Sequence, residues 1–290
     1  MSQKTKIEWT DSTWNPVTGC TKVSAGCANC YAERITERWG KDFSRIVEHP
    51  ERLKQPLSWQ DPRRIFVNSM SDLFHQEVSD KFIEAVFMVM AACAPDSKVW
   101  CGRHTFQILT KRPERMRDFI LNHRFPSGET LAENPLPNVW LGVSVENQRA
   151  ANERIPILLE VPAEVRFLSC EPLLGPVMIT GRWETNGEDA VHDGGIGWVI
   201  CGGETGPHAR PMHPDWARSL RDQSQAANIP FFFKQWGEWA PKEQWFMVPA
   251  DQYKFTDDPQ EMYRVGRIRA GRTLDDKVWD EFPGVKTNAS

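Results

Sequence analysis

Short apolar runs recur along most of the chain, and each ends in a polar or glycine-rich cluster. The runs are rich in β-branched and aromatic residues, a composition typical of β-strands. A helical stretch follows most of them; one spans residues 79–94, with Ser79 in the position of an N-cap. Six runs lie at residues 64–67, 105–109, 139–145, 165–168, 198–200 and 230–233, and residues 7–9 predict an earlier strand.

These runs are continuously apolar instead of alternating, as expected for parallel strands that are covered on both faces. Strands alternating with helices predict right-handed βαβ units. We therefore predict an α/β fold, a partial TIM-like (β/α) barrel of about six or seven mainly parallel strands. The barrel is assigned to residues 1–240, and residues 241–290 are predicted to form a small C-terminal appendage packed on it.

Polar and charged side chains follow the predicted strands at one topological position. Functional sites of such folds lie at the carboxyl ends of the strands. A single polar strand end is ordinary for a surface loop, but six of them favour a lined cavity. A network of salt bridges around the barrel mouth is the structural alternative. The residues concerned are Asn68, Asp72, Lys111, Glu146, Glu171, Glu204 and Lys234.

Composition and charge narrow the possible classes of protein. The 290 residues are 40% hydrophobic and 26% charged, as in a globular chain with a real core, and the net charge of −4 provides no global attraction to nucleic acid. The polar start, Met1–Trp9, resembles no signal peptide, and no run approaches the ~20 apolar residues of a membrane span. We expect a cytoplasmic protein with no membrane partner, whose seven cysteines form no disulfides.

Three of these cysteines lie close together in the sequence. Six residues separate Cys20 from Cys27 and two separate Cys27 from Cys30. Gly19 and Gly26 permit tight turns, and a helix is predicted to begin at Tyr31, with its amino end facing an anionic group.

Close thiolates suit zinc or iron–sulfur clusters. A structural zinc site needs four ligands, whereas three cysteines on a [4Fe-4S] cluster leave one iron open, as binding of S-adenosylmethionine (SAM) requires. Zinc and three unrelated cysteines remain alternatives. The zinc alternative corresponds to a non-catalytic, zinc-stapled nucleic-acid-binding protein, against which the acidic net charge counts. Cys170 and Cys201 stand at predicted strand ends, where they can face the cavity.

The chain resembles a phage and prophage family of unknown function that carries a three-cysteine motif, and this family looks like a radical SAM group with a partial TIM barrel. The resemblance covers nearly the whole chain. The matching segments are residues 7–16, 19–32, 69–74, 109–113, 169–172, 202–204 and 233–237.

The resemblance implies a radical SAM enzyme that abstracts hydrogen from its substrate. Similar proteins occur in pathways that hypermodify thymine in phage DNA, which implies DNA, a modified nucleotide or its attached amino acid as substrate, an isomerase- or lyase-type rearrangement, and a reductant such as flavodoxin or ferredoxin. The glycine–glycine–glutamate triplet that usually binds SAM after the second strand stands here on a late strand, at 202–204. The expected SAM-binding residues at the early-strand position are therefore Asn68, Ser69, Ser71 and Asp72. Tyr31 is expected to join them, because Asn29 stands where an aromatic residue usually precedes the last cysteine and Tyr31 replaces it.

The remaining strand-end side chains are expected to contact the substrate. Lys and Arg hold phosphate or carboxylate groups, carboxylates bind ammonium or hydroxyl groups, and a tryptophan stacks on a base. A radical enzyme sometimes uses a cysteine thiol as hydrogen donor. The residues expected in these catalytic or substrate-binding roles are Lys111, Arg112, Glu146, Glu171, Glu204, Lys234, Trp236, Cys170 and Cys201.

Overall fold

The computed structural model describes residues 5–95, 97, 103–179, 182–185, 188–191, 195–244, 252–255 and 260–284. The chain divides into two compact units. The first contains Met1–Val23, Ala32–Val143 and Arg154–Phe167, and the second contains Ser24–Tyr31, Ser144–Glu153 and Leu168–Ser290.

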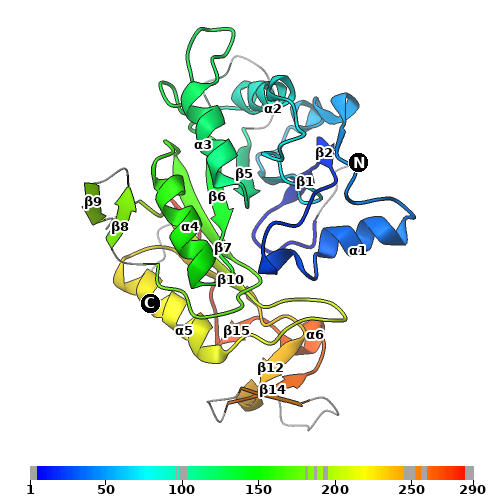
Figure 1. Cartoon of the computed structure of the whole chain (residues 1–290), viewed down its shortest axis with the longest axis vertical. Helices are drawn as coiled ribbons and strands as arrows, with labels where there is room; N and C mark the ends of the chain where they lie inside the picture. The colour runs from blue at the N-terminus through cyan, green and yellow to red at the C-terminus, as the bar shows by residue number, and fades with distance from the viewer. Residues whose placement is uncertain are drawn as a thin grey trace. The chain divides into compact units, whose positions relative to one another are not determined.

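The main element of the fold is a seven-stranded sheet with helices between its strands (Figure 1). Its order is β1-β4-β5-β6-β7-β10-β11, so each strand lies beside the next one along the chain within this sheet. The pairs β1·β4, β4·β5, β5·β6 and β10·β11 are parallel. The fold is thus the predicted partial (β/α) barrel. The strands span Ser12–Trp14 (β1), Arg64–Val67 (β4), Thr105–Thr110 (β5), Val139–Ser144 (β6), Val165–Cys170 (β7), Trp198–Gly202 (β10) and Phe231–Gln235 (β11).

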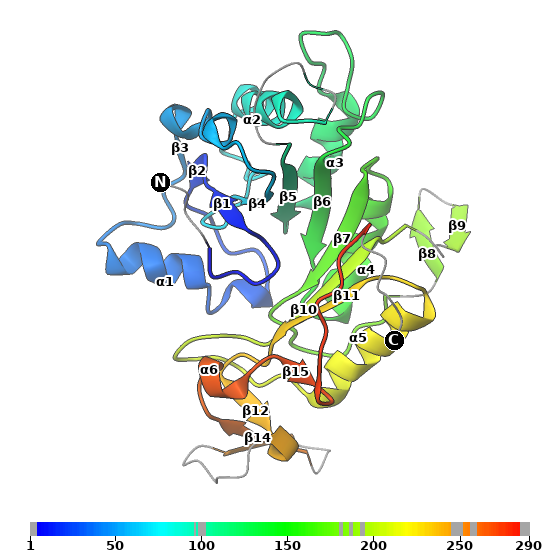
Figure 2. The same cartoon turned by 180° about the vertical axis from the view of Figure 1, so that it is seen from behind.

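The first unit places helices against β4–β6. In Figures 1 and 2, α2 and α3 lie beside β5 and β6. The predicted N-cap is confirmed, because Ser79 Oγ accepts from Phe82 N at 3.3 Å. Phe87 and Phe119 bury their rings between these helices, with centroids 5.7 Å apart. The other elements that begin in residues 15–159 are β2 (Val17–Thr18), η1 (Ala25–Cys27), α1 (Tyr31–Arg38), β3 (Val47–Glu48), η2 (Pro50–Arg52), η3 (Pro56–Ser58), α2 (Asp80–Ala92), α3 (Pro113–Asn122) and α4 (Gln148–Leu159).

The second unit packs α5 against β10 and β11. Its C-terminal segment runs beside β11 (Figure 2), where Phe233 N donates to Trp279 O at 2.8 Å. The remaining elements are β8 (Arg182–Thr185), β9 (Glu188–Val191), α5 (Pro214–Ala226), β12 (Trp239–Pro241), η4 (Lys242–Gln244), β13 (Gln252–Lys254), β14 (Glu261–Arg264), α6 (Arg267–Ala270), β15 (Thr273–Leu274) and β16 (Lys277–Val278).

The predicted appendage at 241–290 includes β13, β14 and α6, and β14 joins β12 and β13 in a three-stranded antiparallel sheet. Residues 245–251, 256–259 and 285–290 of that segment lie outside the described part of the chain. The boundary at residue 240 stays a prediction.

Six of the seven predicted strands are confirmed, and the first is misplaced. The strand predicted at residues 7–9 lies instead at Ser12–Trp14. Trp9 is buried as a core side chain, and Thr10 N closes a turn onto Ile7 O. Asp11 then accepts from Arg64 N and sets the register of β1 on β4. Because the residues before Trp14 are polar, this strand cannot be recognised from its hydrophobic pattern.

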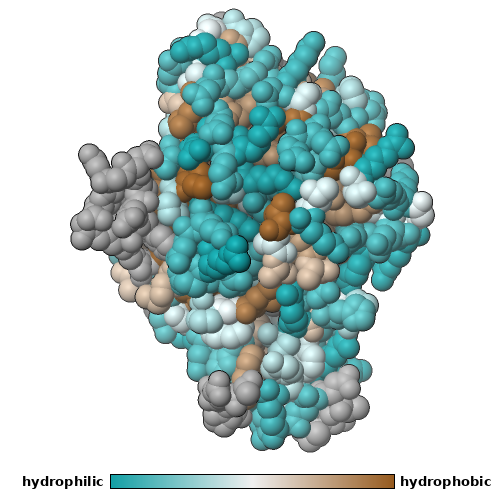
Figure 3. All heavy atoms as spheres, in the orientation of Figure 1, coloured by the Kyte–Doolittle hydropathy of each residue, from teal (hydrophilic) through white to brown (hydrophobic). Residues whose placement is uncertain are grey.

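The surface is predominantly polar on the face shown in Figure 3, where hydrophobic residues form small separate patches. Within the described residues, none of the helices has the length and apolar character needed to cross a bilayer.

Gly142 permits close packing inside the sheet of the first unit. A Cβ atom at this position would lie 2.6 Å from the ring carbons of Phe167, which is itself fully buried. Added volume in a packed core forces neighbouring side chains off their preferred conformations. The sheet therefore requires glycine at residue 142.

We expect Gly142→Ala to lower the free energy of unfolding by about 1–3 kcal/mol in urea denaturation. Gly175→Ala is the matched control, because its Cβ would meet only Asn147 Cβ, at an ordinary 3.6 Å. The control should be neutral or stabilised by up to about 1 kcal/mol. Equal stabilities for the two variants would contradict the packing account.

Candidate functional site

The cysteine loop, residues 20–30, is positioned by backbone contacts at its start. Gly19 has φ 90°, and a Cβ there would lie 2.1 Å from Arg45 O. Gly19 N donates to Met70 O at 3.1 Å, and Cys20 N donates to Phe43 O at 2.8 Å. These contacts fix Cys20 in the first unit beside the segment that follows β4.

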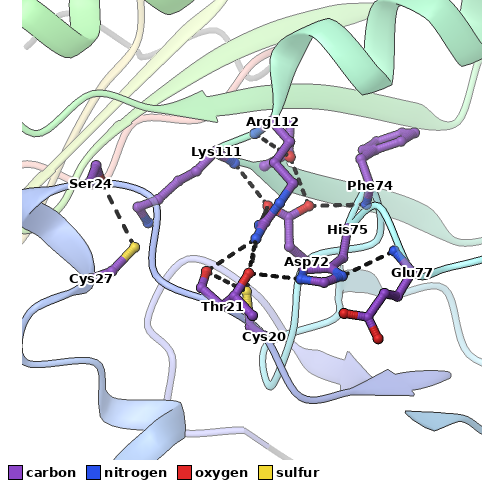
Figure 4. A network of polar contacts seen from close by, with 11 residues as sticks. Cys20, Thr21, Ser24, Cys27, Asp72, Phe74, His75, Glu77, Lys111 and Arg112 are labelled. Carbon is purple, nitrogen blue, oxygen red and sulfur yellow. Dashed lines mark hydrogen bonds and ion pairs between the residues drawn. The ribbon is translucent and has the colours of Figure 1, made fainter. Parts of the chain in front are cut away.

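A buried carboxylate lies in that segment (Figure 4). Asp72 is 5% exposed and accepts four hydrogen bonds. Its Oδ1 accepts from Phe74 N at 3.0 Å and Thr110 Oγ1 at 2.7 Å. Its Oδ2 accepts from Lys111 N and Arg112 Nη1, both at 3.0 Å. The strand ends of β4 and β5 thus meet at Asp72, as parallel neighbours should.

Arg112 links Asp72 to the cysteine loop. Its Nη1 donates to Cys20 Sγ at 3.6 Å, and its Nη2 donates to Thr21 O at 3.1 Å and Thr21 Oγ1 at 3.0 Å. Burial lowers the pKa of Arg112, but Asp72 and Cys20 more than offset this and raise it overall. The guanidinium therefore stays charged beside the thiol.

His75 supports the same threonine. It is fully buried, and its Nδ1 accepts from Glu77 N at 3.2 Å. Burial, with Arg112, holds the pKa of His75 below its ordinary value. The neutral ring therefore carries its proton on Nε2, which lies 2.8 Å from Thr21 Oγ1 and donates to it. Both ring nitrogens are thus engaged, and neither offers a lone pair to a metal.

A second buried carboxylate lies after β10 in the second unit. Glu204 is 5% exposed, and its Oε2 accepts from Arg210 N and Nε at 2.8 Å and from Asn29 Nδ2 at 3.0 Å. Its Oε1 accepts from Arg210 Nη2 at 2.5 Å. Burial raises the pKa of Glu204, but the hydrogen bonds from Arg210 outweigh it and lower the pKa overall. Arg210 Nη2 also donates to Ala25 O at 3.0 Å.

Two longer contacts lie at Cys27 and at the residue before it. Glu146, 1% exposed, accepts from Gly26 N at 3.4 Å. Ser24 Oγ lies 3.9 Å from Cys27 Sγ (Figure 4). Residues Ala25–Cys27 form one 3₁₀ turn, and α1 begins at Tyr31, directly after Cys30. The predicted helix at the last cysteine is confirmed.

Glu171 and Lys234 form an ion pair in the second unit. Lys234 Nζ donates to the two carboxylate oxygens at 2.7 and 2.9 Å, and Gln235 Nε2 donates to Oε1 at 3.3 Å. Gly202 leaves space for this carboxylate, since a Cβ there would lie 3.3 Å from it. Gln235 Oε1 is buried and has no partner among the described residues.

The residues predicted to bind SAM differ from one another in their surroundings. Ser69 Oγ donates to Asn15 Oδ1 at 3.2 Å and Ser71 Oγ to Val17 O at 2.8 Å, so both hydroxyls hold the loop together. Asn68, 3% exposed with φ 60°, accepts from Val17 N through Oδ1. In the described part of the chain its Nδ2 is buried without a partner. Tyr31 is 41% exposed.

The six described cysteines fall into two classes. Cys20, Cys27 and Cys30 are partly exposed, whereas Cys93, Cys170 and Cys201 are fully buried. Burial raises the pKa of the Cys170 and Cys201 thiols, with Glu146 contributing at the first and Cys170 at the second. These two side chains therefore stay protonated, and among the six described cysteines the partly exposed thiols are those of the cysteine loop.

Trp236 lies in the core of the second unit, unlike an exposed stacking residue. It is 1% exposed, its ring packs on Phe233, and its Nε1 donates to Thr273 O at 2.8 Å. It is part of the core, and we assign it no contact with a base.

Sequence reasoning assigned no role to Arg210 or Thr21, and it considered His75 only as a fourth ligand for zinc. Arg210 stands in no recognisable motif, and it acts through Glu204, a carboxylate six residues earlier. The available signal was Asn29, which stands where an aromatic residue usually precedes the last cysteine of radical SAM motifs. Its amide donates to the buried Glu204.

The cysteine loop carries three thiols of the kind that soft metals and iron–sulfur clusters bind. The loop thiols are accessible, Arg112 donates to one sulfur, and the amino end of α1 follows another. Hydrogen bonds to thiolate sulfurs are common around iron–sulfur clusters. Across the residues that the structure describes, no three His, Cys, Asp or Glu side chains already lie close enough together to hold a metal ion.

Comparisons with known proteins add a family. The family described as "Protein of unknown function (DUF5131)" matches residues 4–283. No curated protein and no solved structure matches the chain.

We expect Asp72→Asn to destabilise the protein by about 3 kcal/mol in urea denaturation, since it leaves the charge of Arg112 buried without a counterion. Side-chain exposures of 7% and 14% place this pair in the interior. Asp11→Asn, in the 48% and 34% exposed pair with Arg64, should cost less than about 1 kcal/mol. A loss at Asp72 no larger than the loss at Asp11 would refute the assigned role.

Proposed function

Because this chain belongs to the DUF5131 family of unknown function, we propose its function from the candidate site: it is a radical SAM enzyme. Cys20, Cys27 and Cys30 hold a [4Fe-4S] cluster, and SAM occupies the fourth iron position. The main support for this proposal is that these three thiols are partly exposed, whereas Cys93, Cys170 and Cys201 are fully buried.

The number of available ligands favours a cluster over structural zinc. Zinc in a structural site takes four protein ligands. Cys170 and Cys201 stay protonated, and both ring nitrogens of His75 already have partners. Three thiolates with one open position are what a SAM-binding cluster requires. The alternative is a non-catalytic, zinc-stapled protein, and the tests below distinguish it from a radical SAM enzyme.

When bound, such a cluster supplies the electron that cleaves SAM into methionine and a 5′-deoxyadenosyl radical, which abstracts a hydrogen atom from the substrate. The chain supplies binding and electrostatics. Arg112, held by Asp72, donates to Cys20 Sγ and reduces the negative charge on that sulfur. Such contacts tune the reduction potential of a cluster. A flavodoxin or ferredoxin is proposed as the electron donor.

Among the residues predicted to bind SAM, Asn68 has the best support. All four hydrogen bonds of Asp72 are made within the protein, whereas the buried Nδ2 of Asn68 has no partner within the described ranges. A buried amide without a partner costs about 1–3 kcal/mol, which a ligand acceptor would recover. We propose that Asn68 donates to the carboxylate of SAM.

The Glu171–Lys234 pair is proposed to recognise an amino-acid group on the substrate. A carboxylate binds an ammonium group and a lysine binds a carboxylate. Gln235 Oε1, beside the pair, is a buried acceptor that lacks a partner in the described segments. This chemistry suits a modified thymine or its attached amino acid, and an isomerase- or lyase-type rearrangement of that group.

A basic turn with two exposed arginines supports DNA as the carrier of that base. Residues 264–272 contain four arginines and no acidic residue. Within α6, Arg267 and Arg269 are exposed, and Ile268 between them is 94% exposed. Arginine contacts phosphates, and an exposed apolar side chain can wedge between base steps. The acidic net charge predicts that this binding is weak and depends on salt.

Each of Cys20→Ala, Cys27→Ala and Cys30→Ala should abolish both cluster assembly and release of 5′-deoxyadenosine after anaerobic reconstitution. Cys93→Ala, which removes a buried thiol, should keep four irons per chain and full activity. Iron and sulfide analysis with product chromatography checks both. Full iron in Cys27→Ala, or one tight zinc in a colourless wild type, would overturn the assignment.

Replacing Arg267 and Arg269 together with Gln should weaken binding of duplex DNA about tenfold at low salt. Loss of two phosphate contacts should also reduce the slope of log K against log salt by about 1.8. Arg149→Gln is the control, because Arg149 has an 86% exposed side chain on α4. Fluorescence anisotropy over a salt series measures both quantities. An unchanged slope would exclude the turn as the DNA contact.

A further inference from the structure

The carboxylate of Glu204 is fully engaged inside the second unit. Four donors surround it: Arg210 N, Nε and Nη2, together with Asn29 Nδ2. The side chain is 4% exposed. An ammonium group from a ligand would have to displace Arg210 to reach either oxygen.

The backbone around Glu204 is fixed as tightly as its side chain. A Cβ at Gly203 would lie 1.9 Å from Trp236 O, so this position requires glycine. Gly203 N donates to Gln235 O at 2.9 Å, and Glu238 N donates to Glu204 O at 3.1 Å. The backbones of Gly203 and Glu204 are therefore hydrogen-bonded to the end of β11 and to the residues that follow it.

Contacts of this fixed group reach both sides of Cys27. On one side, Arg210 Nη2 donates to Ala25 O at 3.0 Å. On the other, Asn29 Nδ2 donates to Glu204 Oε2 at 3.0 Å and to His208 O at 2.7 Å. Hydrogen bonds to charged groups contribute more than neutral ones. The turn that carries Cys27 is thus held at two points.

We propose that Glu204 is a positioning residue that, through Arg210 and Asn29, fixes the conformation of the Cys27 turn. It is not a ligand-binding carboxylate, although it stands in a glycine–glycine–glutamate triplet. The inference rests on the proposed function only in taking Cys27 as a cluster ligand. The contacts themselves belong to the metal-free chain.

The rate of thiol alkylation in the metal-free, full-length protein tests this directly. Mass spectrometry after timed exposure to iodoacetamide follows each cysteine separately. Glu204→Gln keeps the shape of the side chain but removes the charge that holds Arg210. We expect alkylation of Cys27 to accelerate at least about tenfold, while Cys20, held by Arg112, reacts at the wild-type rate.

Three further variants separate positioning from general destabilisation. Arg210→Gln should accelerate Cys27 alkylation similarly, and the double variant should react no faster than the faster single variant, because both act through one contact. Glu238→Gln neutralises a carboxylate that accepts from Gly206 N at 2.9 Å, without contact to residues 25–29 in the described structure. It should react at the wild-type rate, and buried Cys93 should stay unmodified in every variant.

The competing role for Glu204 is binding the ammonium of SAM. In that case Glu204→Gln would leave Cys27 alkylation unchanged, and the SAM concentration needed for half-maximal cleavage would rise. That pair of results would overturn the proposal. If the chain binds zinc instead of a cluster, the alkylation result still decides the role of Glu204, so the two proposals fail independently.

Discussion

Two buried carboxylates, each holding an arginine against a main-chain oxygen of the cysteine loop, are the interactions on which the candidate site depends. Asp72 orients Arg112 toward Thr21 O, and Glu204 orients Arg210 toward Ala25 O. Both carboxylates follow a strand of the sheet, so the parallel fold places them. A buried ion pair is costly unless its hydrogen bonds are satisfied, and here nearly every donor and acceptor is used.

This arrangement divides the strand-end residues by task. Asp72, Glu146 and Glu204 contact the residues around the cysteines, whereas Glu171 and Lys234 bind each other beside an unsatisfied amide. In the proposed function, the first group supports the cluster ligands and the second recognises a group of the substrate. A single polar pattern in the sequence therefore corresponds to two different kinds of contact in the structure.

The fold was predictable because the strands are apolar, short and followed by helices, and six of them lie where the pattern indicates. The strand at Ser12–Trp14 was not, since its register depends on Asp11 bonding to Arg64 and not on hydrophobicity. The cysteines were recognisable from their spacing. The role of Arg210 was not recognisable, because a hydrogen bond between loop residues produces no periodic pattern in the sequence. The burial of Trp236 could be learned only from its packing.

The central claim, that the cysteine loop binds a cluster with an iron open to SAM, is tested most directly by electron paramagnetic resonance. The protein would be reconstituted anaerobically with iron and sulfide, reduced with dithionite, and measured with and without SAM. We expect the signal of a reduced four-iron cluster whose g values shift when SAM is added. A cluster signal that SAM leaves unchanged, or a silent protein that retains zinc, would contradict the claim.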